Sequence, residues 1–172
     1  MKKTRIGGAL LLTGTALTLA LGLSGCSALA SILSGGDAER DETTGQVKEG
    51  ADIDIFALKV GDCMPTSESA GEISEASVVP CSEPHGEEVY FEFSLPDGEF
   101  PDDAEIDAQV EAQCLPAFDT FVGMAWEDST LSAYPITPTK DTWDTMNDRV
   151  VQCVILDPDN DALVGTLKGA AR

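Results

Sequence analysis

The residues best suited to chemistry lie in one short stretch, residues 78–93, VVPCSEPHGEEVYFEF. It contains Cys81, the neighbouring Glu87 and Glu88, and His85, which is the only histidine of the 172-residue chain. A histidine beside a carboxylate can act as a general acid or base, or can bind a metal ion. The same residue types also suit a turn that a disulfide holds in place, so a catalytic and a structural interpretation must be compared.

The structural interpretation is favoured. His85 and Glu88 have a spacing that resembles that of metal ligands, but no second histidine exists to complete a zinc site. A turn at residues 84–86, with His85 hydrogen-bonded to a carboxylate such as Glu88, is the more common use of such residues. The sequence therefore predicts no catalytic residue and no metal site here, and we expect His85, Glu87 and Glu88 to form a contact surface.

A second candidate for ligand binding is an acidic turn near the C-terminus. Asp157, Asp159 and Asp161 occupy the first, third and fifth places of a calcium-loop pattern. The pattern then fails, because Ala162 stands where glycine is needed and Lys168 where a bidentate glutamate is needed. The sequence also contains no glycine-rich phosphate loop and no G-x-S-x-G motif, so it predicts no cofactor and no enzyme activity.

Residues 1–25 predict export and a lipid anchor. A basic start is followed by an uncharged apolar run, which is typical of a signal peptide. The run is long enough for a transmembrane helix, but glycine and threonine dilute it and it ends in Leu23-Ser24-Gly25-Cys26. This ending resembles the bacterial lipobox, which implies acylation of the Cys26 thiol and cleavage before it. Two acyl chains would hold the mature chain on the extracytoplasmic face of the cell membrane.

The composition limits the partners. The chain contains 10 Lys and Arg and 31 Asp and Glu, which gives a formal net charge of −21. Cleavage before Cys26 would remove three positive charges and no negative ones, so the mature chain would carry −24. Such a surface repels phosphate backbones, which argues against nucleic acid as a partner. Residues 26–51 are rich in Gly, Ser, Thr and charge and predict a flexible acidic tether, which leaves residues 52–172 as one domain.

The cysteines predict a covalent framework. Four remain when Cys26 is set aside, namely Cys63, Cys81, Cys114 and Cys153. An even number in an exported chain indicates two disulfides, and the wide spacings argue against a zinc site or a C-x-x-C redox site. Of the three possible connectivities we favour Cys63–Cys81 with Cys114–Cys153, because each bond joins neighbouring elements.

Strands are predicted on both sides of the His85 turn. Short strands are expected at residues 54–64 and 76–81, and a C-terminal hairpin at residues 149–156 and 162–169. In residues 88–95, EVYFEFSL, the side chains alternate between an apolar set and a more polar set, which predicts a half-buried strand. Its two faces are expected to be Val89, Phe91, Phe93 and Leu95 on one side and Tyr90, Glu92 and Ser94 on the other.

One main helix is predicted, from about residue 102 to residue 122. Asp102 and Glu105 have capping-box spacing, apolar residues and Cys114 recur at three- and four-residue steps, and Gly123 is a natural stop. Pro116 is expected to kink or divide the helix. Residues 124–148 are expected to be mostly loop. The predicted fold class is α+β, a small antiparallel sheet with one main helix packed on it and two disulfides.

Four blocks of sequence together resemble a known family: VGDCM, VVPCSEPHGEEVY, EAQCLPAFDTFVG and TWDTMNDRVVQC. They are similar to the septum-formation domain of actinobacterial exported proteins and lipoproteins, over about residues 54–169. The positions that match the family pattern are Gly61, Asp62, Cys63, Pro80, Cys81, Ser82, Pro84, His85, Glu88, Cys114, Trp143, Arg149 and Cys153. The chain departs from the pattern at Asn147 and Gly86, where Gly and Asp are common.

The resemblance implies a disulfide-bonded extracytoplasmic domain associated with septum formation, and it brings no reaction or catalytic residue with it. We therefore expect a non-catalytic binding or structural module of the cell envelope, with an envelope protein or the cell wall as its partner. The alternative is an envelope hydrolase that uses His85 with Glu87 or Glu88 as acid and base. Burial separates the two, because a catalytic His85 should line an open cleft and a structural one should pack under the Cys81 disulfide.

Overall fold

The β-branched and aromatic runs of the sequence form strands, and most of these strands join one antiparallel sheet. The computed structural model describes residues 37–66 and 73–172. In the larger sheet the strands follow the order β2, Cys63–Met64; β4, Glu87–Ser94; β6, Val150–Leu156; and β5, Ser132–Ile136. A smaller sheet pairs β1, Ala51–Asp54, with β3, Glu75–Val78. Short 3-10 turns at Ile55–Ala57 and Trp126–Asp128 complete the connections.

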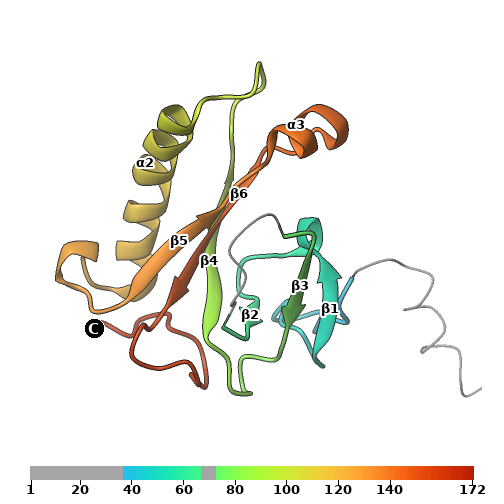
Figure 1. The fold of residues 1–172 in the computed structure, drawn as a ribbon. Coiled ribbons are helices and arrows are strands. Elements are labelled where there is room, and N and C mark those ends of the chain that lie inside the picture. The colour runs from blue at the N-terminus through green and yellow to red at the C-terminus, as the bar shows by residue number, and fades with distance from the viewer. Residues whose placement is uncertain (1–36, 67–72) are drawn as a thin grey trace, which may run out of the picture.

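The main helix, α2, spans Asp103–Val122 and packs on one face of the larger sheet. Asp102 caps its first turn by accepting a hydrogen bond from the Glu105 N–H at 2.9 Å, and Gly123 ends it with φ 80°. The helix runs through Pro116 without interruption, so the expectation that this proline divides it is wrong. Figure 1 shows α2 and the smaller sheet on opposite sides of the larger sheet.

Strand β4 has a bulge that the alternation of its sequence does not reveal. The pairing with β6 shifts between Val89 and Phe91, which leaves Tyr90 as the extra residue. Val89 therefore packs in the cluster under the smaller sheet, whereas Tyr90 and Phe91 both pack with α2. The predicted single face of Val89 with Phe91 is wrong, and Tyr90 is 4% exposed instead of facing solvent.

The C-terminal half differs from the prediction in two ways. Residues 124–148 contain β5 and a second helix, α3, Lys140–Met146. Strand β6 pairs with β4 and β5, and no returning strand forms at residues 162–169. These last residues instead run alongside the His85 turn and bury Leu163 and Leu167 against α2. The predicted hairpin fails because the strand partner of β6 comes from earlier in the chain.

The folded part begins earlier than the predicted boundary at residue 52. Ala38 and Val47 are buried in the cluster under the smaller sheet, and Arg40 forms a bidentate ion pair with Asp62. Residues 37–51, which the composition assigned to the flexible tether, thus pack against the domain. The rest of the predicted tether, Cys26 and the predicted signal peptide lie outside the described residues. In the part of the chain that the structure describes, no helix is both long and apolar enough to cross a membrane.

The predicted disulfide connectivity is confirmed. Cys63 is bonded to Cys81 and Cys114 to Cys153. The first bond ties β2 to the His85 turn, and the second ties α2 to β6. All four cysteines are buried, which fits a structural role.

Candidate functional site

The His85 turn is part of the interior. His85 is 1% exposed, and its Nδ1 lies 2.9 Å from the backbone carbonyl of Glu83. Because a carbonyl oxygen can only accept, Nδ1 carries the proton. Nε2 is buried and has no hydrogen-bond partner among the described residues. The expected bond between His85 and Glu88 is not formed.

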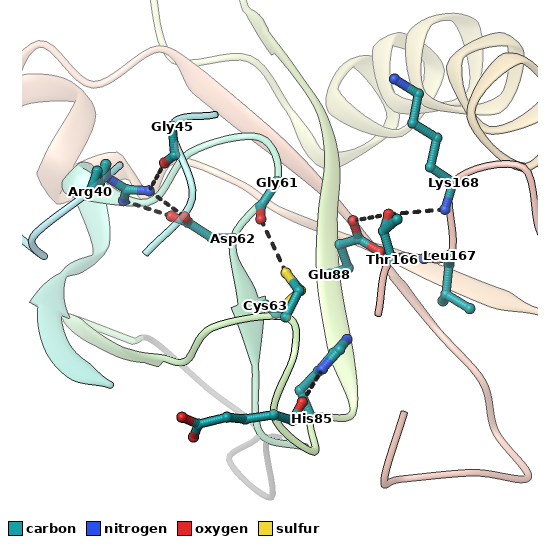
Figure 2. Close-up of a disulfide and its surroundings, with 12 residues drawn as sticks. Arg40, Gly45, Gly61, Asp62, Cys63, His85, Glu88, Thr166, Leu167 and Lys168 are labelled. Atoms are coloured by element: carbon teal, nitrogen blue, oxygen red, sulfur yellow. Dashed lines mark hydrogen bonds and ion pairs between the residues drawn. A yellow bond between two sulfur atoms is a disulfide. The ribbon is translucent and has the colours of Figure 1, made fainter. Parts of the chain in front are cut away.

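The two glutamates after the turn point to opposite faces of the sheet. Glu88, 2% exposed, accepts hydrogen bonds from the Thr166 hydroxyl at 2.6 Å and the Leu167 N–H at 2.7 Å (Figure 2). Glu87, 5% exposed, accepts a hydrogen bond from the Tyr134 hydroxyl at 2.7 Å. His85, Glu87 and Glu88 therefore do not form one exposed contact surface, since all three side chains are buried and the two glutamates face opposite sides of the sheet.

The turn instead binds the C-terminal segment, residues 163–167. The His85 N–H and carbonyl form a bridge with Leu163, with distances of 3.0 and 2.7 Å. The Gly165 N–H donates to the Cys81 carbonyl at 2.6 Å. Together with the two bonds of Glu88, these contacts tie the end of the chain to the disulfide-braced turn. The chemistry-bearing residues of this stretch are thus used to build the fold.

One group of potential metal ligands occurs among the described residues: Cys63, Cys81 and Glu88, whose ligand atoms lie within 4.8 Å of one another. The two sulfur atoms are bonded to each other, and a disulfide sulfur is not the thiolate that metals require. The residues therefore do not fit a metal ion. At the acidic C-terminal turn, Asp157 pairs with Arg172 at 2.7 Å and accepts the Asp159 N–H at 3.0 Å, as in an ordinary turn.

Both departures from the family pattern have a local reason. Asn147 ends α3 in the left-handed conformation, with φ 55°, where glycine is the most favourable residue and asparagine the next. Gly86 lies against Thr66, and a Cβ built on it would lie 2.9 Å from the Thr66 nitrogen. A side chain at position 86 would require this backbone to move.

A cavity does exist, on the sheet face opposite α2. It has a volume of about 840 Å³ and lies between the larger sheet, the Ile55–Ala57 turn and α3 with the loops on either side of it. We call it the open-face groove. Its lining residues come from segments far apart in the sequence, and they are Ile55, Phe56, Leu58, Lys59, Thr66, Ile73, Glu87, Glu92, Tyr134, Pro135, Ile136, Thr137, Thr139, Thr142, Asp148, Val150, Gln152 and Leu156.

The floor of the groove is polar at its centre. Gln152 of β6 is paired in register with Glu92 of β4 on one side and with Ile136 of β5 on the other. Tyr134 contributes its hydroxyl, whose pKa is raised mainly by burial and further by the neighbouring Glu87 carboxylate. Phe56, 44% exposed, stands at the rim. The groove can therefore offer hydrogen-bond acceptors, negative charge and one aromatic surface to a ligand.

Of the residues that line this groove, only Glu87 is among the functional candidates that the sequence predicts. Glu92 lies in a strand whose alternation predicts one solvated face, and an alternating pattern alone cannot tell a bare face from one that a second sheet partly covers. The only signal at position 152 is a glutamine in the otherwise apolar run RVVQCVIL.

Comparison with known proteins agrees with this architecture. The family model described as "Septum formation" matches residues 60–172, which is more than half of the chain and includes both disulfides and most of the groove. The comparison with curated proteins and the comparison with solved structures gave no match to the chain. On the strength of the family match, the chain belongs to the septum formation family.

Proposed function

We propose that the protein is a lipid-anchored binding module on the extracytoplasmic face of the cell membrane, that it is non-catalytic, and that it acts in septum formation during cell division through its open-face groove. The observation that carries this proposal is the groove itself. It is a cavity of about 840 Å³, and it is lined by hydrogen-bond acceptor groups and by one exposed aromatic ring. This size falls within the usual range of ligand sites, about 300–1,000 Å³. The family supports a role in cell division or the cell envelope.

The hydrolase alternative finds less support. It requires His85 to reach a substrate together with Glu87 or Glu88. His85 is 1% exposed and lines neither this groove nor the neighbouring cavity at Phe56, Leu95 and Met146. Neither glutamate is hydrogen-bonded to His85, because Glu87 accepts from the Tyr134 hydroxyl and Glu88 from Thr166 and Leu167. We therefore assign the envelope role to binding.

The anchor is tested by changing Cys26→Ala in the full-length chain. This variant should lose acyl labelling, should remain uncleaved and should fail to complement a deletion strain. A cleaved and labelled variant would contradict the lipid anchor. The localisation follows from the same strains, since a fluorescent fusion of the wild-type chain should gather at the division septum.

The groove is tested with a matched pair of exposed apolar side chains. Phe56 is 44% exposed at the groove rim, and Val164 is 67% exposed away from it. Phe56→Ser should impair complementation and septal localisation, whereas Val164→Ser should not, and both should melt within a few degrees of the wild type. Equal and full complementation by both variants would show that the groove is not the functional surface.

A further inference from the structure

The charges that line the open-face groove favour one class of ligand. Its charged lining side chains are three carboxylates, Glu87, Glu92 and Asp148, against one cation, Lys59. Glu92 lies exposed on the sheet face, and the Asp148 carboxylate is fixed at the end of the floor by hydrogen bonds from Thr142 and the Val150 N–H. A cavity with an excess of carboxylates in an acidic protein attracts positively charged groups and repels anions.

A second and independent feature is the Gln152 side chain at the centre of the floor. The residue is only 5% exposed and lines the groove, and no hydrogen bond joins its amide to another described residue. The amide is not among the fully enclosed unpaired atoms of the described residues, so its polar end reaches the space of the groove, where a ligand can pair with it. An amide oriented into the groove beside Glu92 can accept from and donate to a ligand that enters there.

The edge of the sheet adds a reason to expect a peptide. Strand β5 is an edge strand of the larger sheet, and Pro135 and Thr137 line the groove. Pro135 is opposite Cys153 in the register. Because proline has no N–H, this pair cannot exchange hydrogen bonds, and the Pro135 carbonyl points away from β6. A free main-chain acceptor at an edge is the kind of group that binds the N–H of an extended peptide.

We propose that the groove binds an extended peptide segment that carries lysine or arginine side chains. The cationic end group lies at Glu92 and Gln152, and the aliphatic part of the side chain packs over Ile136 and Val150, as long cationic side chains commonly do. The inference rests on the proposed function, because it names the ligand of the same groove. A divalent cation is a poorer occupant, because the metal-ligand geometry found among the described residues lies at the disulfide and not here.

The test uses the full-length protein in non-ionic detergent and three fluorescein-labelled peptides: Ala-Lys-Ala-Lys-Ala, and the same sequence with Gln or with Glu in place of Lys. Binding is measured by fluorescence anisotropy at physiological salt. The lysine peptide should bind, and the glutamine and glutamate peptides should bind at least tenfold more weakly. A glutamine peptide that binds as well as the lysine peptide would overturn the charge preference.

Three variants place the binding in the groove. Glu92→Gln and Gln152→Leu should each weaken binding of the lysine peptide about two- to fivefold, the effect of one partly exposed ion pair or hydrogen bond. Glu111→Gln is the control, because it removes the same charge from the exposed side of α2, outside the groove. Equal weakening by Glu92→Gln and Glu111→Gln would show attraction to the overall acidic surface and would overturn the inference.

The outcome also separates this inference from the proposed function. If Phe56→Ser impairs complementation but the lysine peptide does not bind the wild-type protein, the groove is functional and the ligand class is wrong. An N-acetylglucosamine tetrasaccharide serves as a neutral glycan probe, and its binding in place of the lysine peptide would likewise reject a peptide ligand. If Phe56→Ser complements fully while Glu92→Gln still weakens peptide binding, the inference stands and the proposed use of the groove in septum formation fails.

Discussion

Glu88 accepts a hydrogen bond from the backbone N–H of Leu167 at 2.7 Å, across 79 positions of sequence. A second bond comes from the Thr166 hydroxyl at 2.6 Å. These two bonds satisfy a carboxylate that is 2% exposed and would otherwise be costly to bury. The turn that could have held a catalytic centre is therefore the attachment point of the C-terminal segment.

The first prediction follows from this contact. Glu88→Ala should lower the free energy of unfolding by about 2–4 kcal/mol, because it leaves a buried N–H unpaired and removes a charge-assisted bond. For a domain of this size, Tm should fall on the order of 10 °C. Glu92→Ala, at an exposed position of the same strand, is the control and should change Tm little. Equal Tm changes in the two variants would show that the C-terminal segment does not depend on Glu88.

The second prediction concerns His85, on which every catalytic interpretation depends. His85→Ala should lower the free energy of unfolding by about 2–4 kcal/mol, because it leaves a cavity and an unpaired Glu83 carbonyl. His85→Asn should recover part of this loss, since its amide can donate to the same carbonyl. At temperatures well below their Tm, both variants should be exported and should complement a deletion strain. A His85→Ala protein that is as stable as the wild type yet fails to complement would point to a catalytic role.

The third prediction addresses the N-terminal segment, residues 37–50. Arg40 is 15% exposed, and its partner Asp62 is 1% exposed. Arg40→Met should leave a buried carboxylate without its cation and should cost about 2–4 kcal/mol of stability. Lys48→Met is the control, because Lys48 pairs with the exposed Glu39 at 3.2 Å and such pairs contribute at most about 1 kcal/mol. Hydrogen exchange of the Asp41 and Lys48 amides, which donate to the Gln46 and Glu39 carbonyls, should accelerate in Arg40→Met alone. If both variants behave alike, the ion pair does not hold this segment.

Much of the fold was accessible from local sequence signals. The capping box at Asp102, the stop at Gly123 and the spacing of apolar residues together define α2 within one residue. The disulfide pairing followed from parity and from the closeness of the elements. These features depend on residues near one another in the chain, where propensity and periodicity carry most of the information.

The remaining features depend on contacts between distant segments. The bulge at Tyr90 interrupts an alternation that looks regular, because one inserted residue changes the pairing without changing the residue types. The N-terminal segment looks like a tether by composition, yet Arg40 meets Asp62 only in the folded chain. The groove requires five separate parts of the chain to come together, so its floor at Gln152 could not be predicted from a pattern within one strand.

The fourth prediction concerns alkaline pH and the two tyrosines of the chain. Burial raises the pKa of Tyr90, whose hydroxyl donates to the Cys114 carbonyl at 3.1 Å. Burial also raises the pKa of Tyr134, and the hydrogen bond to Glu87 and the charge of this carboxylate add to the effect. In the unfolded chain both hydroxyls ionise near the ordinary value of about 10.

The sign of the effect follows from proton linkage. Above about pH 10 the unfolded chain has released protons that the folded chain still holds, so raising the pH further favours unfolding. The stabilisation is therefore complete below about pH 10 and is lost as the pH rises, by at most about 1.4 kcal/mol per pH unit for each tyrosine. Urea unfolding with intact disulfides, between pH 8 and pH 11, measures this slope.

Two variants assign the slope to the tyrosines. Tyr90→Phe and Tyr134→Phe each lose a hydrogen bond, so each should be about 1 kcal/mol less stable at pH 8. Each should also lose part of the decline above pH 10, and the double variant should lose most of the tyrosine contribution. The slope of each variant is compared with the slope of the wild type, so that the contributions of all other groups cancel. A double variant whose stability declines as steeply as that of the wild type would show that the two hydroxyls ionise equally well in the folded and unfolded chain.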